Sequence, residues 1–104
     1  MSALLLARER FTTMLARFLL AIEARDQRRV LDYVRRCDTC PLGHPRSTHR
    51  VGLGADIILY DASGRPLMDG AAHEPLHDLW DARGGAPRIA ADMGHYSLPW
   101  EGVR

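Results

Sequence analysis

The first quarter of the chain carries hydrophobic residues at helical spacing. Six of them recur at intervals of three and four residues: Phe11, Met14, Leu15, Phe18, Leu19 and Ile22. This period is typical of an amphipathic α-helix, and Ser2 is a suitable N-cap residue. We therefore predict one helix over residues 2–25, with its apolar face packed on a sheet. Binding to a membrane surface is the alternative use of such a face.

The segment after this helix also has a pattern that suits a helix. Val30, Leu31 and Val34 would lie on one side of a helix that begins with Asp26 as its N-cap and ends near Cys37. Residues 38–46 contain two prolines and a glycine, and we expect a loop there.

The most continuous apolar run, residues 55–60, predicts a strand in the centre of a sheet, buried on both faces. Asp56 interrupts this run. A carboxylate in such a place is costly unless a metal ion or an arginine compensates its charge. Gly52 and Gly54 precede the run, which indicates a backbone with positive φ or one that passes close to other atoms.

The remainder alternates turns with short elements. Residues 61–64 have the composition of a hairpin turn, and residues 65–69 are expected to return as a short edge strand, because Pro66 does not suit a central strand. Residues 70–73 are expected to form a loop. Leu76, Leu79 and Trp80 then predict a helix over residues 74–83.

The last predicted element is a strand over residues 95–98, after which Trp100 is expected to pack on the core. Together these elements predict an α+β fold in which a small antiparallel sheet packs against N-terminal helices. At 104 residues we expect a single domain that covers residues 1–104.

The composition is that of a small globular protein and changes this picture little. The net charge is +1 and 46% of the residues are hydrophobic, so no strong field favours nucleic acid. The N-terminal apolar run is only five residues long and is followed by charges, which does not suit a signal peptide or a membrane span. We expect synthesis in the cytoplasm, no stable membrane insertion and a monomer.

Two short segments contain the residue types of a metal site. His49 and Asp56 are seven residues apart, and Asp92 and His95 are three apart. Two imidazoles and one carboxylate, from His49, His95 and Asp56, can occupy three corners of a zinc tetrahedron and leave the fourth for water. Asp92 is then a candidate general base. Ser47 is a candidate for a hydrogen bond that orients a ligand.

These motifs resemble those of the zinc D-Ala-D-Ala carboxypeptidases and phage endolysin peptidases, the L-alanyl-D-glutamate peptidases among them, which share a hedgehog-like fold. Ser47, His49, Gly52 and Asp56 occupy the Ser, His, Gly and Asp positions of the family's first motif, and Asp92 and His95 those of its second. The ending Gly94-His95-Tyr96-Ser97 is similar to that of the phage branch. The family usually carries alanine at the position of Gly54. The resemblance covers residues 11–104.

The resemblance implies a zinc peptidase that cuts peptidoglycan stem peptides, with a cell-wall peptide as its partner. It implies that Asp92 takes a proton from the water and passes it to the leaving amine. It also implies a short strand near residues 26–37 and an arginine there that stabilises the oxyanion. Arg28, Arg29, Arg35 and Arg36 are the candidates, and we select Arg29. An endolysin of this kind acts on the cell wall after release across the inner membrane.

Alternative readings stay open at this point. The string His73-Glu74-Pro75-Leu76-His77 matches the HExxH motif of zincins, but proline is tolerated only in the first turn of a helix. We therefore expect His73 and His77 to face solvent or to stand at a helix start.

Cys37 and Cys40 form a Cys-x-x-Cys pair that suits loop positions, a local metal or disulfide, or a redox role. His44 is a possible residue at the edge of the site. A non-catalytic domain that uses zinc only for stability is the alternative to an enzyme.

Overall fold

The computed structural model describes residues 2–33 and 48–104. Its elements follow in the order α1 (Ala3–Ala24), β1 (Arg28–Tyr33), the 3-10 helix η1 (Thr48–Val51), β2 (Gly54–Tyr60), the 3-10 helix η2 (Gly70–His73), α2 (Glu74–Ala82) and β3 (His95–Ser97). The fold is α+β, as predicted. The predictions for Arg35, Arg36, Cys37, Cys40, His44 and Ser47, and for the loop over residues 38–46, lie outside the described residues.

The sheet has three antiparallel strands in the order β1-β2-β3, so the predicted central position of β2 is confirmed. The predicted burial on both of its faces is wrong, because helices cover only one of them. Alternate side chains of β2 point to opposite faces. Ala55, Ile57 and Leu59 are buried on one face, whereas Asp56 and Ile58 on the other are only partly buried. We call the first the covered face and the second the open face.

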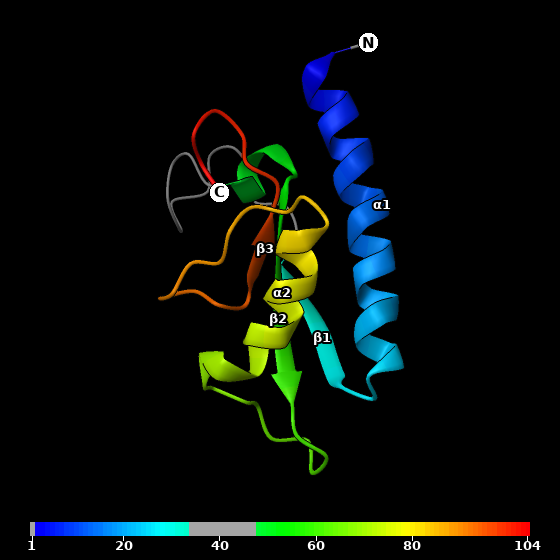
Figure 1. Cartoon of the computed structure of the whole chain (residues 1–104), viewed down its shortest axis with the longest axis vertical. Coiled ribbons are helices and arrows are strands. Elements are labelled where there is room, and N and C mark those ends of the chain that lie inside the picture. Colours follow the sequence, from blue (N-terminus) through cyan, green and yellow to red (C-terminus); the bar gives the residue numbers. More distant parts are fainter. Residues whose placement is uncertain (1, 34–47) are drawn as a thin grey trace.

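The two helices pack on the covered face (Figure 1). α1 begins after Ser2, whose side chain accepts a hydrogen bond from the Leu5 N–H, and buries Phe11, Leu15, Phe18 and Ile22. Full burial of each such side chain contributes about 1.5–3 kcal/mol. The apolar face of α1 is therefore used for the core, and no helix in the described part of the chain is long and apolar enough to cross a membrane.

The core between helices and sheet is centred on aromatic rings. Phe18 lies 5.0 Å from Trp80 of α2 and 4.7 Å from Tyr96 of β3, measured between ring centroids. The indole N–H of Trp80 donates to the carbonyl of Ser97 at 3.0 Å, so its one polar group is satisfied. Trp100 packs against this core, as predicted.

The helix predicted over residues 26–37 is wrong for its described part, residues 26–33. Asp26 has a φ of +58°, which ends α1 and is incompatible with the extended N-cap conformation that a new helix needs. The chain then forms β1, which pairs with β2 from Arg28 opposite Tyr60 to Tyr33 opposite Asp56. A strand satisfies the backbone groups of the exposed edge of β2 and therefore prevails over the local helical pattern.

Other boundaries differ by small amounts. The strand expected over residues 65–69 is reduced to one bridge between Tyr60 and Pro66, since proline has no N–H to extend a ladder. The expected loop over residues 70–73 is a 3-10 helix, in which Asp69 caps the N–H of Ala71. His73 is the N-cap residue of α2, so its expected position at a helix start is confirmed. The alternative, that His73 and His77 face solvent, is wrong, because only 6% and 0% of their surfaces are exposed.

Candidate metal centre

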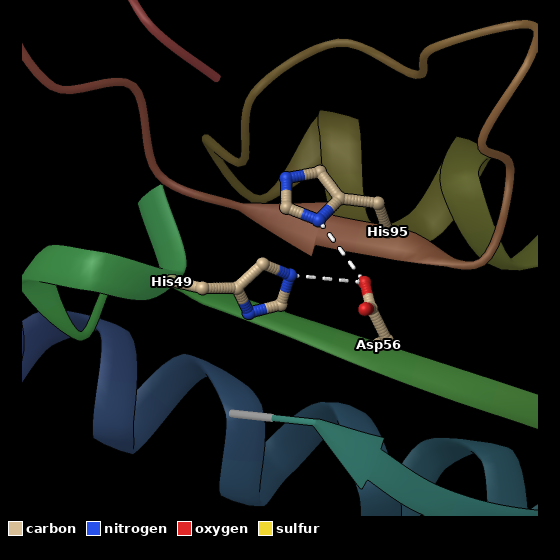
Figure 2. A group of neighbouring side chains, drawn as sticks. All are labelled: His49, Asp56 and His95. Atoms are coloured by element: carbon tan, nitrogen blue, oxygen red, sulfur yellow. Dashed lines mark hydrogen bonds and ion pairs between the residues drawn. The ribbon is translucent and has the colours of Figure 1, made fainter. Parts of the chain in front are cut away.

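Three predicted ligands meet at the end of the open face (Figure 2). His49 comes from η1, Asp56 from β2 and His95 from β3. Asp56 and His95 are direct partners in the antiparallel register, which places their side chains on the same face of the sheet. The backbone turns between η1 and β2 at Gly52, whose φ of +75° strongly favours glycine. This turn brings His49 back over Asp56.

Both imidazoles are directed at one carboxylate oxygen. Nε2 of His49 lies 3.1 Å and Nδ1 of His95 lies 3.2 Å from Oδ1 of Asp56. The two rings meet edge to face with centroids 4.9 Å apart. Both histidines are buried, while the Asp56 side chain is 31% exposed. The cluster is therefore enclosed on the histidine side and accessible at the carboxylate.

The electrostatics of the cluster favour a charged carboxylate. Burial by itself raises the pKa of Asp56. The hydrogen bonds and positive charge of His49 and His95 outweigh this effect, so the pKa of Asp56 lies well below its usual value. Asp56 is thus an anion at neutral pH, which is the form that binds metals.

The donor set fits a metal ion. One ligand atom from each of the three residues lies within 4.8 Å of the other two. Two ligands at about 2.1 Å from a tetrahedral zinc ion are about 3.4 Å apart, so only small side-chain movements are needed to surround one. Within residues 2–33 and 48–104, no other group of three or more such residues converges in this way.

Thr48 supports this geometry and was not predicted. It is 1% exposed, and its hydroxyl lies 3.3 Å from Nε2 of His95. With an ion in place of the hydrogen bond between Nδ1 and Asp56, the hydroxyl can accept from Nε2–H, which would leave the lone pair of Nδ1 for the ion. Thr48 therefore performs the orienting role that we predicted for its neighbour Ser47. A hydroxyl beside a ligand was the available sequence indication.

The absence of a side chain at position 54 has a steric reason. A methyl group at this position would lie 2.6 Å from the Thr48 hydroxyl and 3.0 Å from Cε1 of His95. Alanine, which is usual in the resembling motif, would displace both residues. Glycine at position 54 therefore leaves the space that the Thr48 hydroxyl occupies. The departure from the family pattern is only one methyl group, but it decides whether this hydroxyl fits.

The remaining predicted site residues lie elsewhere. Arg29 pairs with Leu59 in the register and so projects to the covered side, where its guanidinium binds Glu23 of α1 at 2.7 Å. Asp92 lies in the turn before β3, where its carbonyl accepts from the His95 N–H at 3.1 Å. Its side chain is exposed and lines a pocket that adjoins the cluster along β2. In this conformation, neither side chain joins the three ligands.

No protein-family model, no curated protein sequence and no solved structure is significantly similar to this chain. The geometry of the site itself therefore carries the functional argument.

Proposed function

We propose that this protein is a zinc metallopeptidase of the hedgehog-like D-Ala-D-Ala peptidase type, and that it hydrolyses a peptide bond in peptidoglycan stem peptides. The observation that carries the proposal is the convergence of His49, Asp56 and His95 from three separate elements. These residues stand at the ligand positions of the two motifs that resemble the carboxypeptidases and phage endolysins. The similarity in sequence spacing is thus supported by a separate observation, the proximity of these three side chains in space.

His49 Nε2, Asp56 Oδ1 and His95 Nδ1 are the atoms that would hold the ion, because they face one another. Zinc, when bound, polarises a carbonyl oxygen and lowers the pKa of a coordinated water molecule. Three protein ligands leave a coordination position for that chemistry. The exposed edge of Asp56 indicates the side from which a peptide approaches.

Asp92 is the proposed general base. Its carboxylate forms no hydrogen bond to any residue in the described part of the chain, so it is available to accept a proton and to pass it to the leaving amine. Its place in the turn that leads into His95 keeps it on the segment that carries a ligand. Arg29 is bound to Glu23, and the proposal does not depend on it.

The test combines zinc analysis with digestion of purified muropeptides, followed by mass spectrometry. Wild type should bind one zinc ion and release peptide fragments. Asp92→Asn should keep the zinc and lose at least about a hundredfold in rate, the usual contribution of general base catalysis. Asp32→Asn, which removes one exposed carboxylate of β1, is the matched control.

Three results would decide against the proposal. Full activity of Asp92→Asn would refute the assigned base. Zinc that persists in His49→Ala would place the metal elsewhere. Wild type that binds zinc in this site but leaves all muropeptides intact would support the alternative, a zinc-stabilised domain without catalytic activity.

A further inference from the structure

The pocket that Asp92 lines opens along the edge of β2, next to the candidate metal cluster. The Ile57 N–H donates to the Gly94 carbonyl at 2.9 Å, and the Leu67 N–H donates to the Leu59 carbonyl at 2.8 Å. The edge of β2 is thus covered first by the segment before β3 and then by the segment after the hairpin turn. The two segments diverge between these bonds and enclose about 480 Å³. This volume is within the range of about 300–1,000 Å³ that is usual for pockets that bind small molecules.

The pocket has apolar walls and few polar groups. Ile58, Leu67 and Met93 contribute apolar surface. Besides the phenol of Tyr60, the ionisable lining residues are Asp69, His73 and Asp92. No arginine from the described residues lines it. The pocket therefore combines two carboxylates and one imidazole with an aliphatic surface.

His73 directs an N–H into this pocket. Its Nδ1 lies 2.7 Å from the hydroxyl of Tyr96, which is fully buried and has no other hydrogen-bond partner among the described residues. Donation to Nδ1 is the arrangement that satisfies the buried Tyr96 O–H, because no other acceptor among the described residues is within reach; we infer that neutral His73 then carries its proton on Nε2. Burial, with the nearby His77, lowers the pKa of His73 and keeps it neutral.

The other ring nitrogen of His73 is the unusual feature. Nε2 lies 3.6 Å from the point where a side chain on Gly94 would begin, and Gly94 also lines the pocket. His73 is 94% buried, since only 6% of its surface is exposed, yet Nε2 has no partner within residues 2–33 and 48–104. An unpaired buried donor is costly, and a ligand oxygen would satisfy it.

The two carboxylates of the pocket offer negatively charged acceptors, in contrast to the donor of His73. Asp69 uses Oδ1 to cap the Ala71 N–H at 2.9 Å, and its second oxygen has no partner among the described residues. The same holds for the side chain of Asp92. A metal ion does not fit, because Asp69, His73 and Asp92 do not bring ligand atoms together as the described cluster of His49, Asp56 and His95 does. The complement is an organic ammonium group.

We propose that this pocket binds the zwitterionic end of an aliphatic amino acid. The ammonium group binds the free oxygen of Asp69, the carboxylate accepts from Nε2–H of His73, and the aliphatic chain packs on Ile58 and Met93, which leaves Asp92 for the role of base. If the protein is a peptidase of stem peptides, as proposed above, the ligand is the side chain of a diamino acid in the substrate. That step rests on the proposed function, whereas the binding itself does not.

The test is a titration of ¹⁵N-labelled protein, followed by amide chemical shifts, with three matched probes. Diaminopimelic acid carries an ammonium and a carboxylate at each end, cadaverine lacks the carboxylates and pimelic acid lacks the ammonium groups. We expect diaminopimelic acid to shift the amides of the pocket, Gly94 among them, and to bind at least about tenfold more tightly than either analogue.

Variants separate the pocket from the metal site. Asp69→Asn keeps the oxygen that caps Ala71 and should weaken binding about tenfold, because it removes a charge-assisted hydrogen bond. Asp32→Asn, outside the pocket, should bind as wild type does. His49→Ala should also bind normally, because the pocket does not use the metal cluster.

Several outcomes would overturn the proposal. These are equal binding of cadaverine and diaminopimelic acid, equal affinity of Asp69→Asn and Asp32→Asn, no shift in the pocket, or binding that disappears in His49→Ala. The last result would mean that the amino acid chelates an ion at His49. Normal binding of diaminopimelic acid by a protein that cuts no muropeptide would refute the proposed peptidase and leave the pocket assignment intact.

Discussion

Two groups of histidines lie on opposite sides of the sheet and behave differently. On the open face, His49 and His95 both turn a nitrogen toward one oxygen of Asp56 (Figure 2). Under α2, His77 has a separate partner for each nitrogen: Nδ1 lies 3.1 Å from Oδ1 of Asp81 and Nε2 lies 2.9 Å from the Met93 carbonyl. We call these the open cluster and the covered network.

The difference shows that convergence of ligand atoms, and not the presence of histidines alone, distinguishes a group that could hold a metal ion. In the covered network the His77 ring is also stacked on Tyr96, with centroids 4.2 Å apart and an interplanar angle of 16°. A ring with both nitrogens engaged and one face stacked has no lone pair to offer. His77 therefore serves the core, although the spacing of His73 and His77 matches a zinc motif.

The largest expected effect is on metal binding. His49→Ala removes one of three ligands and should weaken zinc binding by more than about a hundredfold, if a structural site of about 10–16 kcal/mol is shared among its ligands. His77→Leu should keep wild-type zinc stoichiometry. Competition with a chelator measures both. Equal loss of zinc in the two variants would erase the distinction between the open cluster and the covered network.

The second effect is on stability. His77→Leu leaves the Met93 carbonyl and the Asp81 carboxylate without their imidazole partner, and should lower the free energy of unfolding by about 2–4 kcal/mol. Urea unfolding measures this, with Asp32→Asn as the control. A variant as stable as wild type would show that the covered network is replaceable by an apolar side chain.

A smaller effect is expected at Thr48. Thr48→Val keeps the shape but removes the hydroxyl that holds Nε2 of His95, and should weaken zinc binding about tenfold, as do other changes to groups that orient ligands. Thr48→Ser, which retains the hydroxyl, is the matched control. NMR of the His95 ring nitrogens gives a second readout: in the zinc-loaded wild type the ring should carry its proton on Nε2. A proton on Nδ1 would contradict the orienting role.

The smallest effect is a dependence of stability on pH. The pKa of His73 is lower in the folded protein than the ordinary value of 6.5, so the unfolded chain binds more protons in this range. Folding stability should therefore be full above pH 6.5 and should fall as the pH decreases through 6.5 and then through the lower folded pKa. Urea midpoints at a series of pH values should show a shallower dependence for His73→Gln. Parallel curves would exclude His73 as a source of the pH dependence.

The hydrophobic pattern of the sequence was sufficient to predict the elements in which that pattern fits only a helix or only a strand. The spacing from Phe11 to Ile22 predicted α1, the apolar run predicted the central strand β2, and Leu76 and Trp80 predicted α2. The helix and strand inferences need only neighbours in sequence, because side-chain period is a local property. The candidate ligands His49, Asp56 and His95 were identified from their residue types and from the resemblance to two motifs, whereas their proximity is a result of the fold.

Tertiary structure decided what depends on partners distant in the chain. Residues 28–33 became a strand because the edge of β2 offered hydrogen bonds, which no local propensity records. Burial of His73 and His77 followed from the packing of α2 against Tyr96, and the role of Thr48 from its contact with a residue 47 positions away. The residue types were present in the sequence, but only the fold determines which atoms face one another.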